Sequence, residues 1–181
     1  MQVIKQFYDI DKKVKDIAEK ISLEYKDTGN QEIPVFICVL QGGAMFFHDL
    51  IKSLKVECCT EYVRLKSYKG KTASTPGNIK ILSDIQVDIK GKPIYIIDDI
   101  IDTGATMAKL MSHLSELEPA YIKTVTLVER KAVVFKSDYC CFRNMGDEWF
   151  VGYGFDKDGK CRNYKNLYSD GKVKKVNEEV V

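Results

Sequence analysis

Three carboxylates and a set of hydroxyl-bearing and glycine residues follow one another within residues 94–107. An apolar stretch ends in the adjacent acids Asp98 and Asp99, and a third acid, Asp102, begins the segment Asp-Thr-Gly-Ala-Thr. This segment opens a helical pattern, and the backbone N–H groups at the start of a helix can bind an anion such as phosphate. Carboxylates beside such a site would repel a bare phosphate, so we expect a sugar hydroxyl or a metal ion to lie between them.

The simplest alternative for residues 102–106 is an ordinary helix cap, in which the Asp102 side chain accepts hydrogen bonds from the first backbone N–H groups. The preceding acid pair favours a ligand site instead. Side chains alternate along a strand, so we expect Asp98 and Asp99 to point to opposite sides of the sheet. Vicinal hydroxyls and Mg²⁺ are suitable ligands for these carboxylates, and a ribose that carries phosphates would satisfy the acids and the helix start together.

The elements that position these residues alternate between strand and helix patterns. We expect strands at about residues 34–40, 56–66, 79–82, 94–97, 121–128, 139–142 and 149–155. Helical spacing covers about 14–25, with Asp9 or Asp11 as its cap, and about 47–54 and 105–117. This alternation predicts a mainly parallel sheet with helices on both faces, whose ligands bind beyond the carboxyl ends of the strands. Residues 67–78 are polar and aperiodic, which is typical of a functional loop.

The composition predicts one soluble domain. The chain has 181 residues, of which 45% are hydrophobic and 30% charged, and its net charge is +2. This length allows a sizeable core, and the balanced charge argues against a nucleic-acid-binding protein. We find no apolar segment of membrane-spanning length and no signal peptide, so we expect a cytoplasmic protein without membrane contact. The six cysteines form no CxxC pair, so we expect reduced thiols and no zinc-finger type of metal site.

Four segments, in order, carry a resemblance to a known family. Residues 94–107 resemble the phosphoribosyl-pyrophosphate (PRPP) motif of type I phosphoribosyltransferases. Residues 39–43 resemble the pyrophosphate loop of that family, and residues 64–68 the start of its mobile lid. Residues 149–156, with Arg162 and Asn163, resemble the purine end of its hypoxanthine-guanine branch. Together these segments cover most of the chain.

The resemblance implies a fold and a reaction. The fold is a single α/β domain over residues 1–181, with a core of about 1–155 and a small hood over the purine site, formed mainly by the C-terminal segment. The reaction transfers the 5-phosphoribosyl group from PRPP to hypoxanthine or guanine, gives IMP or GMP and pyrophosphate, and requires Mg²⁺. The resemblance also implies a homodimer or homotetramer. Two alternatives stay open: a PRPP-sensing regulator that binds nucleic acid on the same fold, and a transferase for another base such as xanthine.

The family roles map onto residues of this sequence. The 5′-phosphate site would be formed by Asp102, Thr103, Gly104, Ala105 and Thr106. Asp98 and Asp99 would contact the ribose hydroxyls directly or through Mg²⁺. Asp102 would lie near N7 of the purine and serve as the general acid/base. The pyrophosphate would be bound by Gln41, Gly42, Gly43 and Arg162, after a Leu40–Gln41 peptide that is often cis in the family. The lid would begin at Ser67 and Tyr68.

Two residue assignments at the purine site stay open: the residue that stacks on the base and the residue that donates to its O6 atom. Either Trp149 or Phe150 could stack on the base, and Asp156 would contact a second Mg²⁺. A donor-only side chain favours a 6-oxopurine, because adenine presents an amino group at that position. The family uses a lysine there, and this sequence offers either Arg130 or Lys131. The sequence also departs from the family pattern at Gln41, which replaces a common lysine, in the lid at Pro76, and after Asn163, where no apolar strand is evident.

Overall fold

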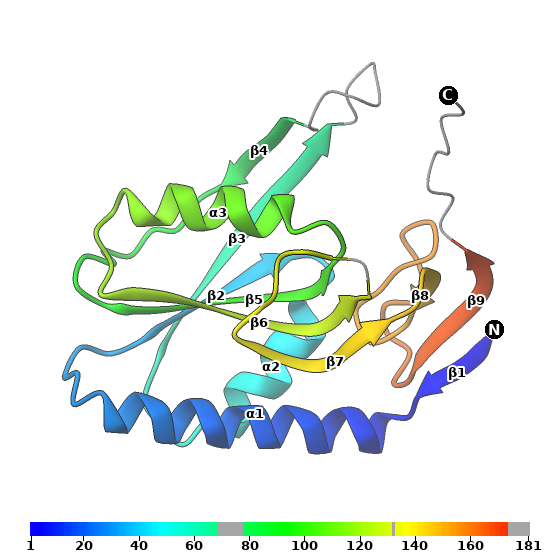
Figure 1. Cartoon of the computed structure of the whole chain (residues 1–181), viewed down its shortest axis with the longest axis horizontal. Helices are drawn as coiled ribbons and strands as arrows, with labels where there is room; N and C mark the ends of the chain where they lie inside the picture. The colour runs from blue at the N-terminus through cyan, green and yellow to red at the C-terminus, as the bar shows by residue number, and fades with distance from the viewer. Residues whose placement is uncertain (69–77, 132, 174–181) are drawn as a thin grey trace.

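A computed structural model describes residues 1–68, 78–131 and 133–173 of the chain (Figure 1). Its centre is a six-stranded sheet in the order β4-β3-β2-β5-β6-β7. The strands are β2 (Val35–Leu40), β3 (Cys59–Tyr68), β4 (Asn78–Ser83), β5 (Pro93–Ile101), β6 (Tyr121–Arg130) and β7 (Tyr139–Met145). All neighbouring pairs are parallel except β3 and β4, which are antiparallel. The predicted fold class is therefore confirmed.

Helices cover both faces of the central sheet (Figure 1). The helices α1 (Phe7–Asp27) and α2 (Ala44–Ser53) pack on one face, and α3 (Ala105–Ser115) packs on the other. Alternate residues of each buried strand enter the two cores, so Phe36 and Cys38 meet α1 and α2, while Ile37 and Val39 join the core with α3. β2 and β5 are buried on both faces, as their continuous apolar runs predict.

A second, three-stranded antiparallel sheet forms the hood beside the central sheet (Figure 1). Its strands are β1 (Gln2–Lys5), β9 (Leu167–Val173) and β8 (Glu148–Val151), in the order β1-β9-β8. Neither β1 nor β9 was expected, and β9 forms after Asn163 although its segment, LYSDGKV, has no apolar strand pattern. The N-terminal residues contribute to the hood together with the C-terminal segment.

Several element boundaries differ from the expected ones. β5 continues to Ile101, so Asp98 and Asp99 lie within the strand, and β6 continues to Arg130. α1 begins after Gln6, so neither Asp9 nor Asp11 is its cap. β8 ends at Val151, and turns follow it. Of the expected polar loop, residues 67, 68 and 78 belong to β3 and β4, and residues 69–77, with Pro76, lie outside the described chain.

None of the helices in the described part of the chain is long and apolar enough to span a membrane.

Candidate active site

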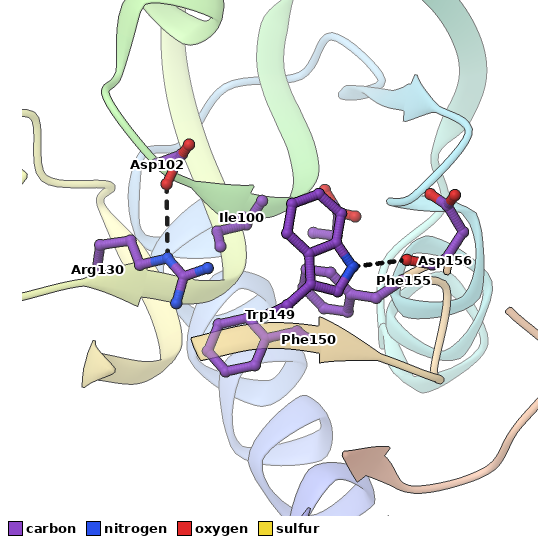
Figure 2. Close-up of a pocket in the computed structure, with 8 residues that line it drawn as sticks. Ile100, Asp102, Arg130, Trp149, Phe150, Phe155 and Asp156 are labelled. Atoms are coloured by element: carbon purple, nitrogen blue, oxygen red, sulfur yellow. Dashed lines mark hydrogen bonds and ion pairs between the residues drawn. The ribbon is translucent and has the colours of Figure 1, made fainter. Parts of the chain in front are cut away.

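Two pockets adjoin at the carboxyl ends of β5 and β6. The larger, of about 380 Å³, is lined by Asp98, Asp99, Ile100, Ile101, Asp102, Thr103, Gly104, Thr106 and Met107. The smaller, of about 180 Å³, is lined by Asp99, Ile100, Asp102, Arg130, Trp149, Phe150, Phe155 and Asp156 (Figure 2). Asp99, Ile100 and Asp102 line both pockets, which therefore share a wall. Such adjoining pockets suit a ligand with a charged part and a flat apolar part.

Gly104 forms the turn from β5 into α3. Its φ of 85° lies in the left-handed region, which glycine adopts without steric cost. Gly104 is also the N-cap residue of α3, so Asp102 does not occupy the N-cap position of this helix. The Thr103 hydroxyl accepts a hydrogen bond of 3.3 Å from the N–H of Ala105. The first turn of α3 thus begins in the wall of the larger pocket, where its N–H groups can bind an anion.

The glycines after β2 lie directly against the acids of β5. The Leu40–Gln41 peptide is cis, as the family resemblance implied. A Cβ atom added to Gly42 would overlap Oδ2 of Asp99, and one added to Gly43 would overlap the carbonyl oxygen of Val39. Only a residue without a side chain allows this close approach. The structure therefore brings residues 41–43 to the site that Asp98 and Asp99 line.

The two carboxyl groups of the acid pair lie close together and are withdrawn from water, which disfavours their charged forms. The backbone N–H of Asp99 donates to Oδ1 of Asp98 at 2.9 Å, which draws this side chain back along the strand. Both acids line the larger pocket and their carboxyl groups interact, so the expectation that they point to opposite sides of the sheet is wrong. Burial raises the pKa of both carboxyl groups, and the charge of Asp99 raises the pKa of Asp98 further. A bound cation or a set of hydroxyl donors would relieve this repulsion.

Arg130 forms one wall of the smaller pocket, where its side chain lies between Asp102 and Phe150 (Figure 2). Its guanidinium carbon lies 4.3 Å from the centre of the Phe150 ring, and Nη1 donates to the carbonyl oxygen of Gly146. Nε lies 3.5 Å from Oδ1 of Asp102, yet this buried atom has no hydrogen-bond partner among the described residues. Arg130 is 5% exposed, whereas Lys131 is exposed and does not line the pocket.

The opposite wall comes from the hood. Trp149 is 42% exposed, and its indole N–H donates to the carbonyl oxygen of Asp156 at 3.1 Å (Figure 2). Phe150 is buried and packs edge-on against Phe155, at 5.6 Å between ring centres. The accessible ring of Trp149 can therefore stack on a planar ligand, whereas Phe150 supports Arg130 from below.

Arg162 connects the hood to the acids of β5. Its Nη2 lies 2.7 Å from Oδ1 of Asp156, and its Nη1 donates to the carbonyl oxygen of Gly154 at 2.6 Å. Its charge also acts on Asp99, whose pKa it lowers against the larger effect of burial. A Cβ atom at Gly154 would overlap the carbonyl oxygen of Gly42, so the hood packs against the glycine segment after β2.

Residues 3–158 match the family model described as phosphoribosyl transferase domain. The chain belongs to this family. It is 38% identical over 159 residues to the hypoxanthine-guanine-xanthine phosphoribosyltransferase of Tritrichomonas foetus, covering 86% of this chain and 83% of that protein. It is 34% identical over 163 residues to the hypoxanthine-guanine phosphoribosyltransferase of Aquifex aeolicus, covering 88% and 89%. The crystal structure of a hypoxanthine-guanine phosphoribosyltransferase from Bacillus anthracis superposes with a TM-score of 0.82 at 31% identity, covering 93% and 97%.

Most of the expected site residues of this phosphoribosyltransferase lie around the two pockets. Asp98, Asp99, Asp102, Thr103, Gly104 and Thr106 line the larger one, and Arg130, Trp149, Phe150 and Asp156 line the smaller one. Ala105, residues 41–43 and Arg162 line neither pocket. Ser67 and Tyr68 end β3, and their side chains lie outside the described structure.

Sequence reasoning missed two lining residues of the smaller pocket, Ile100 and Phe155. The signal for Ile100 was its place between Asp99 and Asp102, where an apolar residue interrupts a polar segment.

Among the acidic residues of the site, Asp98 and Asp99 are better suited to bind Mg²⁺ than Asp156 is. In the described residues no group of three or more His, Cys, Asp or Glu side chains could hold a metal ion. Asp98 and Asp99 nonetheless supply hard oxygen donors with raised pKa values, and Mg²⁺ often binds one or two carboxylates together with substrate phosphates. Asp156 already accepts hydrogen bonds from Arg162 and from the N–H of Gly159, so fewer of its lone pairs remain for a cation.

Proposed function

We propose that this phosphoribosyltransferase is a purine salvage enzyme that transfers the 5-phosphoribosyl group from PRPP to hypoxanthine or guanine, giving IMP or GMP and pyrophosphate. The observation that carries the proposal is the smaller pocket, where a buried Arg130 and an accessible Trp149 face each other across an apolar slot beside Asp102. A planar base fits this slot, and the adjoining pocket can hold a phosphorylated sugar.

Each half of the substrate has its own set of residues. The first turn of α3, with Thr103, Gly104, Ala105 and Thr106, binds the 5′-phosphate through backbone N–H and hydroxyl groups. Asp98 and Asp99 would hold the ribose hydroxyls and Mg²⁺, and the remaining lone pairs of Asp156 would contribute to a second Mg²⁺ site. The metal would supply positive charge that offsets the charge of the departing pyrophosphate.

Base recognition depends on Arg130. A guanidinium only donates hydrogen bonds, so it favours the O6 acceptor of hypoxanthine or guanine over the amino group of adenine. Phe150, Gly146 and Asp102 fix the orientation of the guanidinium, and the exposed Lys131 is not needed for this role. Asp102 lies beside Arg130 and exchanges the proton at N7 of the base as the glycosidic bond forms.

The departing pyrophosphate lies on the other side of the ribose. Gly42 lies against Asp99, so the backbone N–H groups of Gln41, Gly42 and Gly43 would be available to the pyrophosphate there, and Arg162 would supply a positive charge. Ser67 and Tyr68 at the end of β3 begin the lid that excludes water from the electron-poor C1′ atom.

The reaction is tested by nucleotide formation with PRPP, Mg²⁺ and, separately, hypoxanthine, guanine, xanthine and adenine. We expect turnover with hypoxanthine and guanine. Xanthine is included because a relative that is 38% identical bears xanthine in its name. Absence of turnover with every purine would contradict the proposal. Salt-sensitive binding of RNA or DNA in its place would support a PRPP-sensing regulator.

The role of Arg130 is tested by Arg130→Met, with Lys131→Met as the matched control. We expect Arg130→Met to lower kcat/KM for hypoxanthine about 10- to 100-fold, the effect of losing a charge-assisted hydrogen bond. Arg130→Lys should retain most activity because an ammonium also only donates. An equal loss in Lys131→Met would transfer the role to Lys131.

We further propose a cytoplasmic homodimer or homotetramer. Exposed apolar side chains support an interface between copies of the chain: Met45 on α2 is 42% exposed, and Tyr62 on β3 is 37% exposed. Light scattering coupled to size-exclusion chromatography measures the assembly, and a monomer at micromolar concentration would contradict it.

A further inference from the structure

A fully buried carboxylate lies behind the base pocket, on the residue next to Arg130. Glu129 is the penultimate residue of β6, has an exposed fraction of 0%, and lines neither pocket. Side chains alternate along the strand, so Arg130 enters the smaller pocket while Glu129 points to the other face of the sheet. The reaction proposed above assigns Glu129 no role.

The Glu129 carboxylate is saturated with donors from the segment that follows β6. Its Oε1 accepts hydrogen bonds from the backbone N–H of Ser137 at 2.7 Å and from the Ser137 hydroxyl at 2.5 Å. Nη1 of Arg143 lies 2.6 Å from both carboxylate oxygens, and Nη2 of Arg143 donates to the carbonyl oxygen of Ser137 at 2.9 Å. Ser137 is therefore held at its backbone and at its side chain.

Ser137 ends a segment that packs against the phosphate-binding turn. Phe135 lies two residues earlier and joins the core beneath α3. A Cβ atom added to Gly104 would overlap Cβ of Phe135, so the aromatic residue is in direct contact with the glycine that opens α3. The φ of 85° at Gly104 determines where the first N–H groups of α3 point.

These contacts form a continuous path from the base side to the phosphate side. Resting on the proposed function, we infer that Glu129 is a positioning residue of the 5′-phosphate site: its carboxylate holds residues 133–138 against Gly104. The carboxylate thereby links the end of β6, which carries Arg130, to the turn that begins α3. The hydrogen bonds from Ser137 and Arg143 keep the carboxylate charged despite burial, with a net pKa below its usual value.

A purely structural role for Glu129 predicts a different result, and Glu24 supplies the comparison. Glu24 accepts a hydrogen bond from Lys123 at 3.2 Å and another from the Tyr139 hydroxyl, so it also ties distant elements together. It does so beside Lys123 and Tyr139, near the amino ends of β6 and β7, away from both pockets. Glu24→Gln is thus a matched control for loss of a carboxylate network.

The test compares Glu129→Gln, Phe135→Leu and Glu24→Gln by steady-state kinetics and thermal unfolding. We expect Glu129→Gln to raise KM for PRPP about tenfold, because displacement of a binding group by a fraction of an ångström weakens its contacts. KM for hypoxanthine and kcat should change much less. Phe135→Leu should also raise KM for PRPP. Glu24→Gln should lower Tm and leave KM for PRPP unchanged. Arg143→Lys should raise KM for PRPP less than Glu129→Gln does, because a lysine can still donate a hydrogen bond to the Glu129 carboxylate.

Two results would overturn the inference: an unchanged KM for PRPP in both Glu129→Gln and Phe135→Leu, or an equal rise in Glu24→Gln. If Glu129→Gln does not fold, Phe135→Leu decides the question by itself. If the wild-type protein turns over no purine, the proposed reaction fails. The positioning inference is then decided by the Kd of PRPP, measured by calorimetry on the same proteins with Mg²⁺.

Discussion

Two neighbouring strands of the central sheet carry acidic residues near their carboxyl ends, and the surroundings shift the pKa values of these acids in opposite directions. On β5, Asp98 and Asp99 interact with each other, and burial raises the pKa of both groups. On β6, burial alone would raise the pKa of Glu129, but hydrogen bonds from Ser137 and Arg143 outweigh that effect and lower it. The acid pair of β5 lines the larger pocket, whereas Glu129 lines neither of the two pockets. A raised carboxyl pKa beside a pocket is typical of a functional site, and a carboxylate that accepts several hydrogen bonds is typical of a structural one.

The largest effect is expected at a third acid, Asp102, which lies in both pockets and beside Arg130. Asp102→Asn should lower kcat by about 10²- to 10⁴-fold, because an amide cannot exchange a proton with the base. The Kd of PRPP should stay nearly unchanged. Steady-state kinetics and calorimetry measure the two quantities, with Asp84→Asn as a remote control. Equal turnover in Asp102→Asn would remove this residue from the acid/base role.

The comparison between the strands is tested most directly by stability. Asp98→Asn should raise the free energy of unfolding by about 1 kcal/mol, because it replaces a buried carboxyl group whose charged form is disfavoured by burial and by the neighbouring Asp99. Glu129→Gln should lower it by about 1–3 kcal/mol, because it weakens charge-assisted hydrogen bonds. Urea unfolding in EDTA measures both without metal. Changes of the same sign in the two variants would break the comparison, and unchanged KM for PRPP in Asp98→Asn would remove Asp98 from the ribose site.

The effects of Asp98→Asn and Glu129→Gln on the free energy of unfolding should depend on pH in opposite ways. A carboxyl group with a raised pKa binds more protons in the folded protein, so its contribution to stability falls as pH rises above about 4. The stabilisation by Asp98→Asn should therefore grow between pH 4 and pH 7. The lowered pKa of Glu129 gives a contribution that is present at neutral pH and lost as pH falls through its folded-state value. The loss in the free energy of unfolding caused by Glu129→Gln should therefore become smaller at acid pH. Changes that follow pH in the same way in both variants would contradict this account.

The smallest effect is expected at Lys136, whose Nζ lies 3.9 Å from Oε2 of Glu129 and whose side chain is 48% exposed. Lys136→Ala should change the free energy of unfolding by less than about 0.5 kcal/mol, because an exposed, long-range ion pair contributes little. Urea unfolding at low ionic strength measures the change. A cost comparable to that of Glu129→Gln would show that Lys136, and not Arg143, satisfies the buried acid.

Local patterns in the sequence predicted the parts of the fold and of the site that depend on neighbouring residues. β2 carries a continuous apolar run, and residues 98–106 place their acids, hydroxyls and glycine within a few positions of one another. The structure contains both features: the apolar run forms β2, and residues 98–106 lead from β5 into α3. The segment of β9 is polar and contains Gly171, and it becomes a strand only by pairing with β1 and β8, which are distant in sequence.

The choice between Arg130 and Lys131 shows why side-chain placement is harder to predict. It depends on where β6 ends, and sequence periodicity locates strand ends only to within a few residues. The contact between Phe135 and Gly104 had no sequence signal at all, because it joins two loops across the end of the sheet. Likewise, the donors to Glu129 come from residues 137 and 143, which no local pattern connects to it.

The hood has a consequence for the order in which the two pockets can form during synthesis. Trp149 and Phe150 lie on β8, which pairs with β9, and β9 in turn pairs with β1 near the start of the chain. The strands that carry the larger pocket, by contrast, are complete once β6 and its neighbours have left the ribosome. A nascent chain can therefore assemble the larger pocket early, whereas the smaller pocket waits for residues 167–173. A chain released before that point would hold the larger pocket without the hood wall of the smaller one.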